Sequence, residues 1–290
     1  MTGGLRALCA IFAFLLGCVF FSFGGVVVAR LPRGESIVSP GSHCDRCGRT
    51  LKWYENIPLV SWLLQRGRCR GCGEKIGAFP FLFELFGGLG FLAAFLRFGL
   101  APETLFAFAV IWLVGVMAGI DWENHFAYDG MQIAYFLLSA GYALFLCLAR
   151  EGRWSDFVIG GVAGLAVFLL IKGVGRLIAR RECMGMGDVL FMGSTGVLVG
   201  WKALLFCVLV ASVVGAIVEL VRERLHARRR GQGRQQGAAD GSGAQCAKDI
   251  GEESDEKERE VAFLPYLALG AVAAMLFGAP VLAWYLGVLT

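Results

Sequence analysis

The feature that most constrains this chain is a series of apolar segments, most of them long enough to cross a lipid bilayer. They fall at residues 7–29, 79–99, 103–120, 131–149, 156–175, 188–200, 203–221 and 261–288. A spanning helix needs about 20 apolar residues, and backbone inside lipid must be helical or part of a closed barrel. The pattern predicts an all-α polytopic membrane protein with about eight transmembrane helices. The segment 188–200 is short, so we expect it to be buried among the others.

The composition agrees with a membrane protein. The chain is 57% hydrophobic and 17% charged, whereas soluble domains are roughly half apolar and a quarter charged. Its 41 glycines suit close helix packing in lipid. A signal peptide is an alternative for the first segment, but no small-residue cleavage site ends it. We therefore expect residues 1–29 to form the first transmembrane helix.

The basic residues indicate the orientation. Of the 27 Lys and Arg residues, 22 lie in the loops 30–78, 121–130, 172–187 and 222–260. The positive-inside rule places these four loops in the cytoplasm and both termini outside. The net charge of +4 is explained by residues that flank membrane segments. Membrane lipid is therefore an expected partner, and nucleic acid is not.

The polar segments divide the chain. Residues 30–78 are long enough for a small cytoplasmic domain but too short for a large core, so this domain needs a cross-link or a metal. Residues 79–221 form a transmembrane core. Residues 222–260 lack apolar periodicity and are expected to be a disordered cytoplasmic loop. Residues 261–290 carry the last transmembrane helix.

Two cysteine pairs mark the segment 30–78. Each pair has the spacing C-x2-C and is followed by glycine: Cys44 and Cys47, then Cys69 and Cys72. Two such turns can place four thiolates on one tetrahedral Zn²⁺. The alternative is two disulfides, which the reducing cytoplasm disfavours. The spacing predicts a structural zinc site with no open coordination position.

Two aspartates stand at the same predicted depth in the membrane. Asp121 directly follows an apolar segment, and Asp188 begins another one after Gly185 and Gly187. The predicted orientation brings both to the cytoplasmic edge, where ionisable groups suggest a function. The alternatives are a helix N-cap for Asp188 and a solvated helix end for Asp121.

A pair of facing aspartates can share one proton. One carboxylate activates a water molecule while the protonated one polarises the scissile carbonyl, as in aspartic proteases. Gly185 and Gly187 would leave room for a substrate backbone, and Glu123 and Asp129 would attract a basic substrate segment. A proton-relay transporter is disfavoured, because the acidic residues cluster at the ends of the segments.

Together these motifs resemble the type IV prepilin peptidases, which are intramembrane aspartic proteases with a Gly-x-Gly-Asp motif. The resemblance covers the exit of the first segment, the cysteine domain with Glu84, "GIDWENHFAYD", "GMGD" and "LPYLALGA" at 264–271. It implies that Asp121 and Asp188 are catalytic, and that Cys44, Cys47, Cys69 and Cys72 bind zinc.

The resemblance also implies a substrate and a second reaction. Members cleave the leader peptide of type IV prepilins or pseudopilins at the cytoplasmic face of the inner membrane. Many then methylate the new N-terminus with S-adenosylmethionine. The chain departs from the family at Tyr128, where proline is usual, and at Leu190, where lysine is usual. These departures keep open an alternative function, a catalytically silent membrane scaffold that binds pilins.

Overall fold

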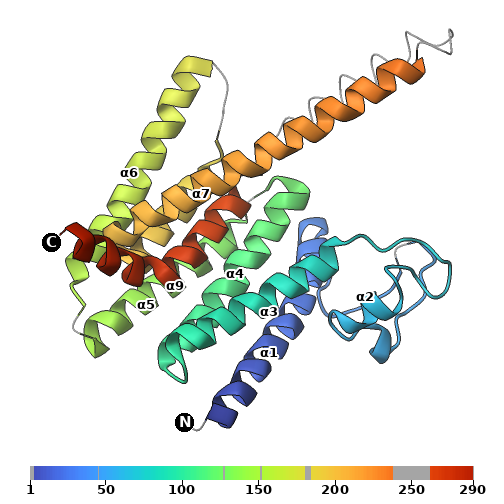
Figure 1. Cartoon of the computed structure of the whole chain (residues 1–290), viewed down its shortest axis with the longest axis horizontal. Helices are drawn as coiled ribbons and strands as arrows, with labels where there is room; N and C mark the ends of the chain where they lie inside the picture. Colours follow the sequence, from blue (N-terminus) through green and yellow to red (C-terminus); the bar gives the residue numbers. More distant parts are fainter. Residues whose placement is uncertain are drawn as a thin grey trace.

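The computed structural model describes residues 3–44, 46–126, 128–150, 152–179, 184–237 and 262–289. In these ranges the protein is nearly all helical (Figure 1). Seven of the described helices are long and apolar enough to cross a membrane. They are α1 (Gly3–Arg30), α3 (Phe79–Phe98), α4 (Pro102–Asn124), α5 (Asp129–Ala149), α6 (Trp154–Ala179), α7 (Met186–Gly237) and α9 (Leu264–Leu289). The expected polytopic membrane fold is confirmed.

The cysteine segment, residues 31–78, projects from the bundle beside α1 and α3 (Figure 1). It contains η1 (Leu31–Arg33), η2 (Trp53–Glu55) and the single short α-helix α2 (Val60–Leu64). Its β structure is limited to two isolated bridges, His43 with Thr50 and Arg68 with Lys75. We call the end of the bundle where this segment leaves the membrane helices the cysteine end.

α7 contains a break at Gly200, where φ is 76° and ψ is 165°. A straight helix would separate positions 188 and 215 by about 40 Å. Yet both positions are linked to the start of α9. Gly215 packs against Tyr266, two residues after Leu264. The N–H of Leu264 donates to Asp121, and Asp121 interacts electrostatically with Asp188. Both positions therefore lie at the cysteine end, and the chain folds back at Gly200.

The two arms of α7, residues 186–199 and 201–237, correspond to the short segment 188–200 and the segment 203–221 expected from the sequence. Gly200 itself lies against the backbone of Asp156, at the start of α6 and the opposite end of the bundle. The second arm continues as helix to Gly237, so the expected loop 222–260 begins as helix. Residues 238–261 lie outside the described residues.

Glycines allow the first arm of α7 to pack tightly on α6. A Cβ atom built on Gly196 would overlap the carbonyl of Gly160, and one built on Gly164 would overlap the carbonyl of Met192. From Gly160 to Gly164 the contact moves four residues forward along α6, and from Gly196 to Met192 it moves four residues back along α7. The two helices are therefore antiparallel. Continuing this register places Lys172 of α6 at the level of the first turn of α7.

Two apolar cores hold the bundle together, and α4 contributes to both. One core joins α4, α5, α6, α7 and α9 and includes Tyr135, Phe168 and Phe191. The other joins α1, α3 and α4 and includes Phe21 and Phe91. α4 is thus packed on two sides, and its last residues lie at the cysteine end.

Candidate active site and metal centre

The four paired cysteines meet in one cluster. The Sγ atoms of Cys44, Cys47, Cys69 and Cys72 all lie within 4.8 Å of one another, and those of Cys44 and Cys72 are 3.8 Å apart. Four thiolates around a zinc ion with Zn–S bonds of ~2.3 Å in tetrahedral geometry would be separated by ~3.8 Å. The cluster therefore fits one tetrahedral metal ion.

The two halves of the cluster are built alike. The N–H of Gly48 donates to the carbonyl of Cys44, and that of Gly73 to the carbonyl of Cys69, each at 2.9 Å. Both glycines have positive φ, 68° and 73°, a conformation that other residues rarely adopt. The N–H of Cys72 and the N–H of Gly71, which donates to Sγ of Cys69 at 3.3 Å, lower the pKa of the Cys69 thiol. Burial and the neighbouring thiols instead raise the pKa of Cys72.

Two glutamates, buried Glu55 and partly buried Glu84, fasten the cysteine segment. The carboxylate of Glu55, only 1% exposed, accepts hydrogen bonds from Arg49 at 2.9 and 3.1 Å and from the N–H of Lys52 at 3.0 Å. The Lys52 N–H and the Arg49 guanidinium hold the pKa of Glu55 below its usual range. Glu84 of α3 accepts from the N–H of Leu59 at 2.7 Å and from Ser22 of α1, and so ties the segment to the membrane helices.

Asp121 lies in the last turn of α4. α4 ends at His125, which adopts the left-handed conformation with φ 52°, and the N–H of His125 donates to the carbonyl of Asp121 at 2.9 Å. The carboxylate of Asp121 accepts a hydrogen bond from the N–H of Leu264 at 3.2 Å. The start of α9 therefore fixes the side chain of Asp121.

Asp188 lies in the first turn of α7. Its carboxylate accepts a hydrogen bond from the N–H of Gly185, and it interacts electrostatically with Asp121 and with Lys172 of α6. α7 begins at Met186, so Gly185 is its N-cap and the expected N-cap role of Asp188 is wrong. As the third helical residue, Asp188 instead accepts from the N–H of the N-cap residue, as in one half of a capping box. The structure brings the two aspartates together from separate helices at the cysteine end.

The other candidate residues lie near this pair along the chain, on α4, at the start of α5 and before Asp188. Glu123 is exposed after Asp121 and interacts electrostatically with Arg33 of η1. Asp129 is exposed in the first turn of α5. A Cβ atom on Gly185 would lie 3.8 Å from Oδ2 of Asp188, an ordinary contact. The carbonyl of Gly187 accepts a hydrogen bond from Gln132 at 2.8 Å.

Tyr128 and Leu190, the two residues that differ from the expected motif, occupy defined positions in the structure. The hydroxyl of Tyr128, the residue before α5, donates to the carbonyl of Leu31 at 2.8 Å and so links the start of α5 to η1. Leu190 is exposed on α7, while Lys172 brings a positive charge to Asp188 from the neighbouring helix.

Sequence reasoning missed three groups that interact with the pair or with Gly187 beside it: Gln132, Lys172 and the N–H of Leu264. Each of them contacts or faces a residue far away in the chain, and no local pattern marks it. For Lys172 a signal did exist. It lies at the start of the loop 172–187, which the charge pattern places on the same side of the membrane as the Gly-x-Gly-Asp motif.

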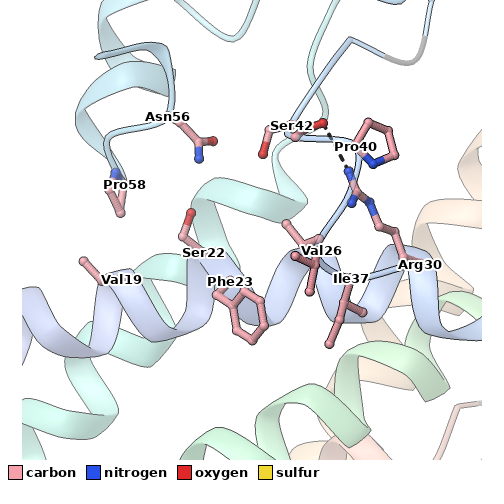
Figure 2. Close-up of a pocket in the computed structure, with 12 residues that line it drawn as sticks. Val19, Ser22, Phe23, Val26, Arg30, Ile37, Pro40, Ser42, Asn56 and Pro58 are labelled. Atoms are coloured by element: carbon pink, nitrogen blue, oxygen red, sulfur yellow. Dashed lines mark hydrogen bonds between the residues drawn. The ribbon is translucent and has the colours of Figure 1, made fainter. Parts of the chain in front are cut away.

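A cavity of about 320 Å³ lies between α1 and the cysteine segment (Figure 2). Phe23 and Ser22 of α1 line one wall, and Asn56 and Pro58 line the other. The guanidinium of Arg30 closes one end while it donates to the carbonyls of Ser36 and Gly41. The lining offers apolar surface, hydroxyls and an amide. None of the described side chains that line it is a carboxylate, so these residues offer no carboxylate for the ribose hydroxyls or the cationic groups of S-adenosylmethionine.

Comparison with known proteins gives matches over most of the chain. Residues 15–98 match the bacterial peptidase A24 N-terminal domain, and residues 107–220 match the type IV leader peptidase family. The chain is 40% identical over 218 residues to a prepilin leader peptidase/N-methyltransferase of Myxococcus xanthus, covering 75% of this chain but only 64% of that relative. The chain thus spans less than two thirds of this relative's length.

Two further relatives carry the same description. The protein from Burkholderia pseudomallei is 31% identical over 297 residues, with 93% of this chain and 85% of the relative covered. The protein from Klebsiella pneumoniae is 33% identical over 207 residues, with 69% of this chain and 90% of the relative covered. No solved structure gives a significant match.

Proposed function

Because the chain belongs to the prepilin leader peptidase/N-methyltransferase family, we propose that it is a membrane aspartic endopeptidase in which Asp121 and Asp188 form the catalytic pair. Its substrates are the leader peptides of type IV prepilins or pseudopilins. The observation that carries the proposal is the meeting of these two carboxylates, from α4 and the first arm of α7, at one end of the bundle.

The chemistry needs one carboxylate charged and the other protonated, a state that mutual repulsion at short range favours. The charged carboxylate takes a proton from a water molecule while the water oxygen attacks the scissile carbonyl carbon. The protonated carboxyl group donates its proton to the carbonyl oxygen. When the tetrahedral intermediate collapses, the C–N bond breaks and the carboxyl group that took the proton from water gives it to the leaving amine. A hydroxyl of the intermediate returns its proton to the other carboxylate, which restores the starting state of the pair. Gly185 and Gly187 leave space for the substrate backbone.

We place the cysteine end in the cytoplasm of a bacterial cell and the helices in its inner membrane. The excess of Lys and Arg in the loops at this end supports that orientation. Glu123 and Asp129 would then meet a basic leader. Reversal to Glu123→Lys should raise the KM for such a leader, and an unchanged KM would remove Glu123 from the substrate site.

The cysteine cluster is proposed to hold a structural Zn²⁺. Four cysteine ligands complete the tetrahedral shell, so the ion would stabilise the segment and take no part in peptide cleavage. Methylation of the new N-terminus with S-adenosylmethionine is proposed from the description of the relatives alone.

The test is cleavage of a prepilin by purified protein in lipid, with Asp121→Asn and Asp188→Asn as matched variants that keep the side-chain shape. Mass spectrometry of the product N-terminus should show leader removal by the wild type only, and an added mass of ~14 Da would report methylation. Full cleavage by either folded variant would refute the pair. If folded wild-type protein retains uncut prepilin through purification, the chain is instead a pilin-binding scaffold.

A further inference from the structure

Gln132 is a buried polar residue next to the candidate catalytic pair that the mechanism above does not use. It lies in the first turns of α5 and is 4% exposed. Its Nε2 donates to the carbonyl of Gly187 at 2.8 Å, and Gly187 directly precedes Asp188. The hydrogen bond therefore links α5 to the residue directly before Asp188 in α7.

This hydrogen bond restrains a flexible part of the backbone. Gly187 has no side chain that could pack against its surroundings, and glycine adopts a wide range of backbone conformations. A side chain from another helix that binds the Gly187 carbonyl fixes the peptide plane between Gly187 and Asp188. The direction in which the side chain of Asp188 points from α7 then depends on Gln132.

The other end of the same amide has no partner. Oε1 of Gln132 is buried and accepts no hydrogen bond. Rotating the amide to satisfy Oε1 would break the bond from Nε2 to Gly187. An unpaired buried acceptor costs free energy, and such groups in native proteins call for an explanation.

In the free protein Oε1 is closed off from solvent, so a bound peptide supplies the missing donor only when its binding moves the side chains that cover this atom. A substrate in extended conformation carries backbone N–H groups that must find acceptors once they leave water. We propose that Gln132 holds Asp188 in place through Gly187 and accepts a hydrogen bond from a backbone N–H of the prepilin near the scissile bond. This inference rests on the proposed peptidase function.

The matched control is Tyr135 on the same helix. Its hydroxyl lies 3.0 Å from Oγ1 of Thr195, so it also links α5 to the first arm of α7, and it is fully buried. Thr195 lies about two helical turns beyond Asp188. If the α5–α7 hydrogen bonds serve only to hold the helices together, Gln132→Met and Tyr135→Phe should affect cleavage alike.

The experiment measures kcat and KM for wild type, Gln132→Met and Tyr135→Phe, using prepilin peptides in which single amides other than the scissile one are replaced by esters. An ester lacks the N–H donor. For the wild type, one ester position should lower kcat/KM by about tenfold, the contribution of roughly one hydrogen bond. Gln132→Met should lower kcat/KM for the all-amide peptide by at least as much, and the same ester should then cost it nothing further.

Three results separate the possible failures. If no ester lowers the wild-type rate, the acceptor role is wrong, and this result requires no variant to fold. If every ester lowers kcat/KM of Gln132→Met by as much as it lowers that of the wild type, the inference is overturned while the peptidase function stands. The same holds if Gln132→Met and Tyr135→Phe lower kcat/KM by the same factor. If folded wild-type protein cleaves none of the peptides or the intact prepilin, the proposed function itself fails.

Discussion

At the residue scale, the candidate site depends on groups that belong to different helices. Asp121 is held by a backbone N–H of α9, and Asp188 by the N–H of Gly185. Lys172 brings a positive charge from α6, and Gln132 reaches Gly187 from α5. No two of these helices alone would place both carboxylates correctly, which explains why a polytopic bundle is needed to build a site with so few polar residues.

The types and positions of the two aspartates could be predicted from the sequence, because each stands at the edge of an apolar segment. The residues that orient them could not. Gln132 is separated from Gly187 by 55 positions, and Leu264 from Asp121 by 143. Such partners are determined by how the helices pack, and a single sequence contains no local signal for this packing.

Glu55 should make the stability of the cysteine segment depend on pH. Its pKa is lowered in the folded state, so its contribution is complete above the unfolded value of about 4.3 and is lost as the pH falls through the lower folded value. Hydrogen exchange of residues 46–76 should show Glu55→Gln less protected than wild type at pH 6. The difference should shrink below pH 4.3, and a difference that grows in acid would contradict this assignment.

At the element scale, α6 packs closely against the first arm of α7, the arm that carries Asp188. Their approach depends on glycines, since a Cβ atom on Gly196 would overlap the carbonyl of Gly160. The break at Gly200 then returns the chain to the cysteine end. The sequence predicted both arms as separate apolar segments. It could not predict their joining by a single residue, because glycine occurs throughout the chain.

Gly196→Ala should push α6 and α7 apart, with a loss of ~1–3 kcal/mol in the free energy of unfolding, as for other overpacked sites. Gly173→Ala is the matched control, because a Cβ atom there meets nothing within 4 Å. Thermal unfolding in detergent should show a lower Tm for Gly196→Ala only. Equal Tm values would mean that the close packing of the two helices is not required.

At the scale of the whole molecule, the cysteine segment and the membrane bundle are distinct parts joined by few bonds. The ligand set could be predicted because two C-x2-C pairs have a characteristic spacing. The attachment through Glu84 to Leu59 and Ser22 could not, since a glutamate in an apolar helix gives no indication of its partners. Metal binding and segment folding should therefore be coupled, while the bundle keeps its own apolar cores.

Zinc removal should accordingly affect one part of the molecule. Purified wild type should contain one equivalent of zinc, and Cys44→Ser should lose it. Proteolysis should then cut within residues 46–76 of the variant, while α4, α5 and α9 stay protected in the bundle. Cys9→Ser is a matched control, because Cys9 lies on α1, away from the cluster. Full zinc content in Cys44→Ser would contradict the four-cysteine site.

The most direct test of the central claim asks whether Asp121 and Asp188 act as one unit. Leader cleavage would be measured for the wild type, Asp121→Asn, Asp188→Asn and the double variant in the same lipid, with the fold of each checked by thermal unfolding. A shared catalytic function predicts that both single variants and the double variant fall to the same background rate, since residues that act as a unit are not additive. Substantial cleavage by either single variant, or losses that add in the double variant, would contradict the account.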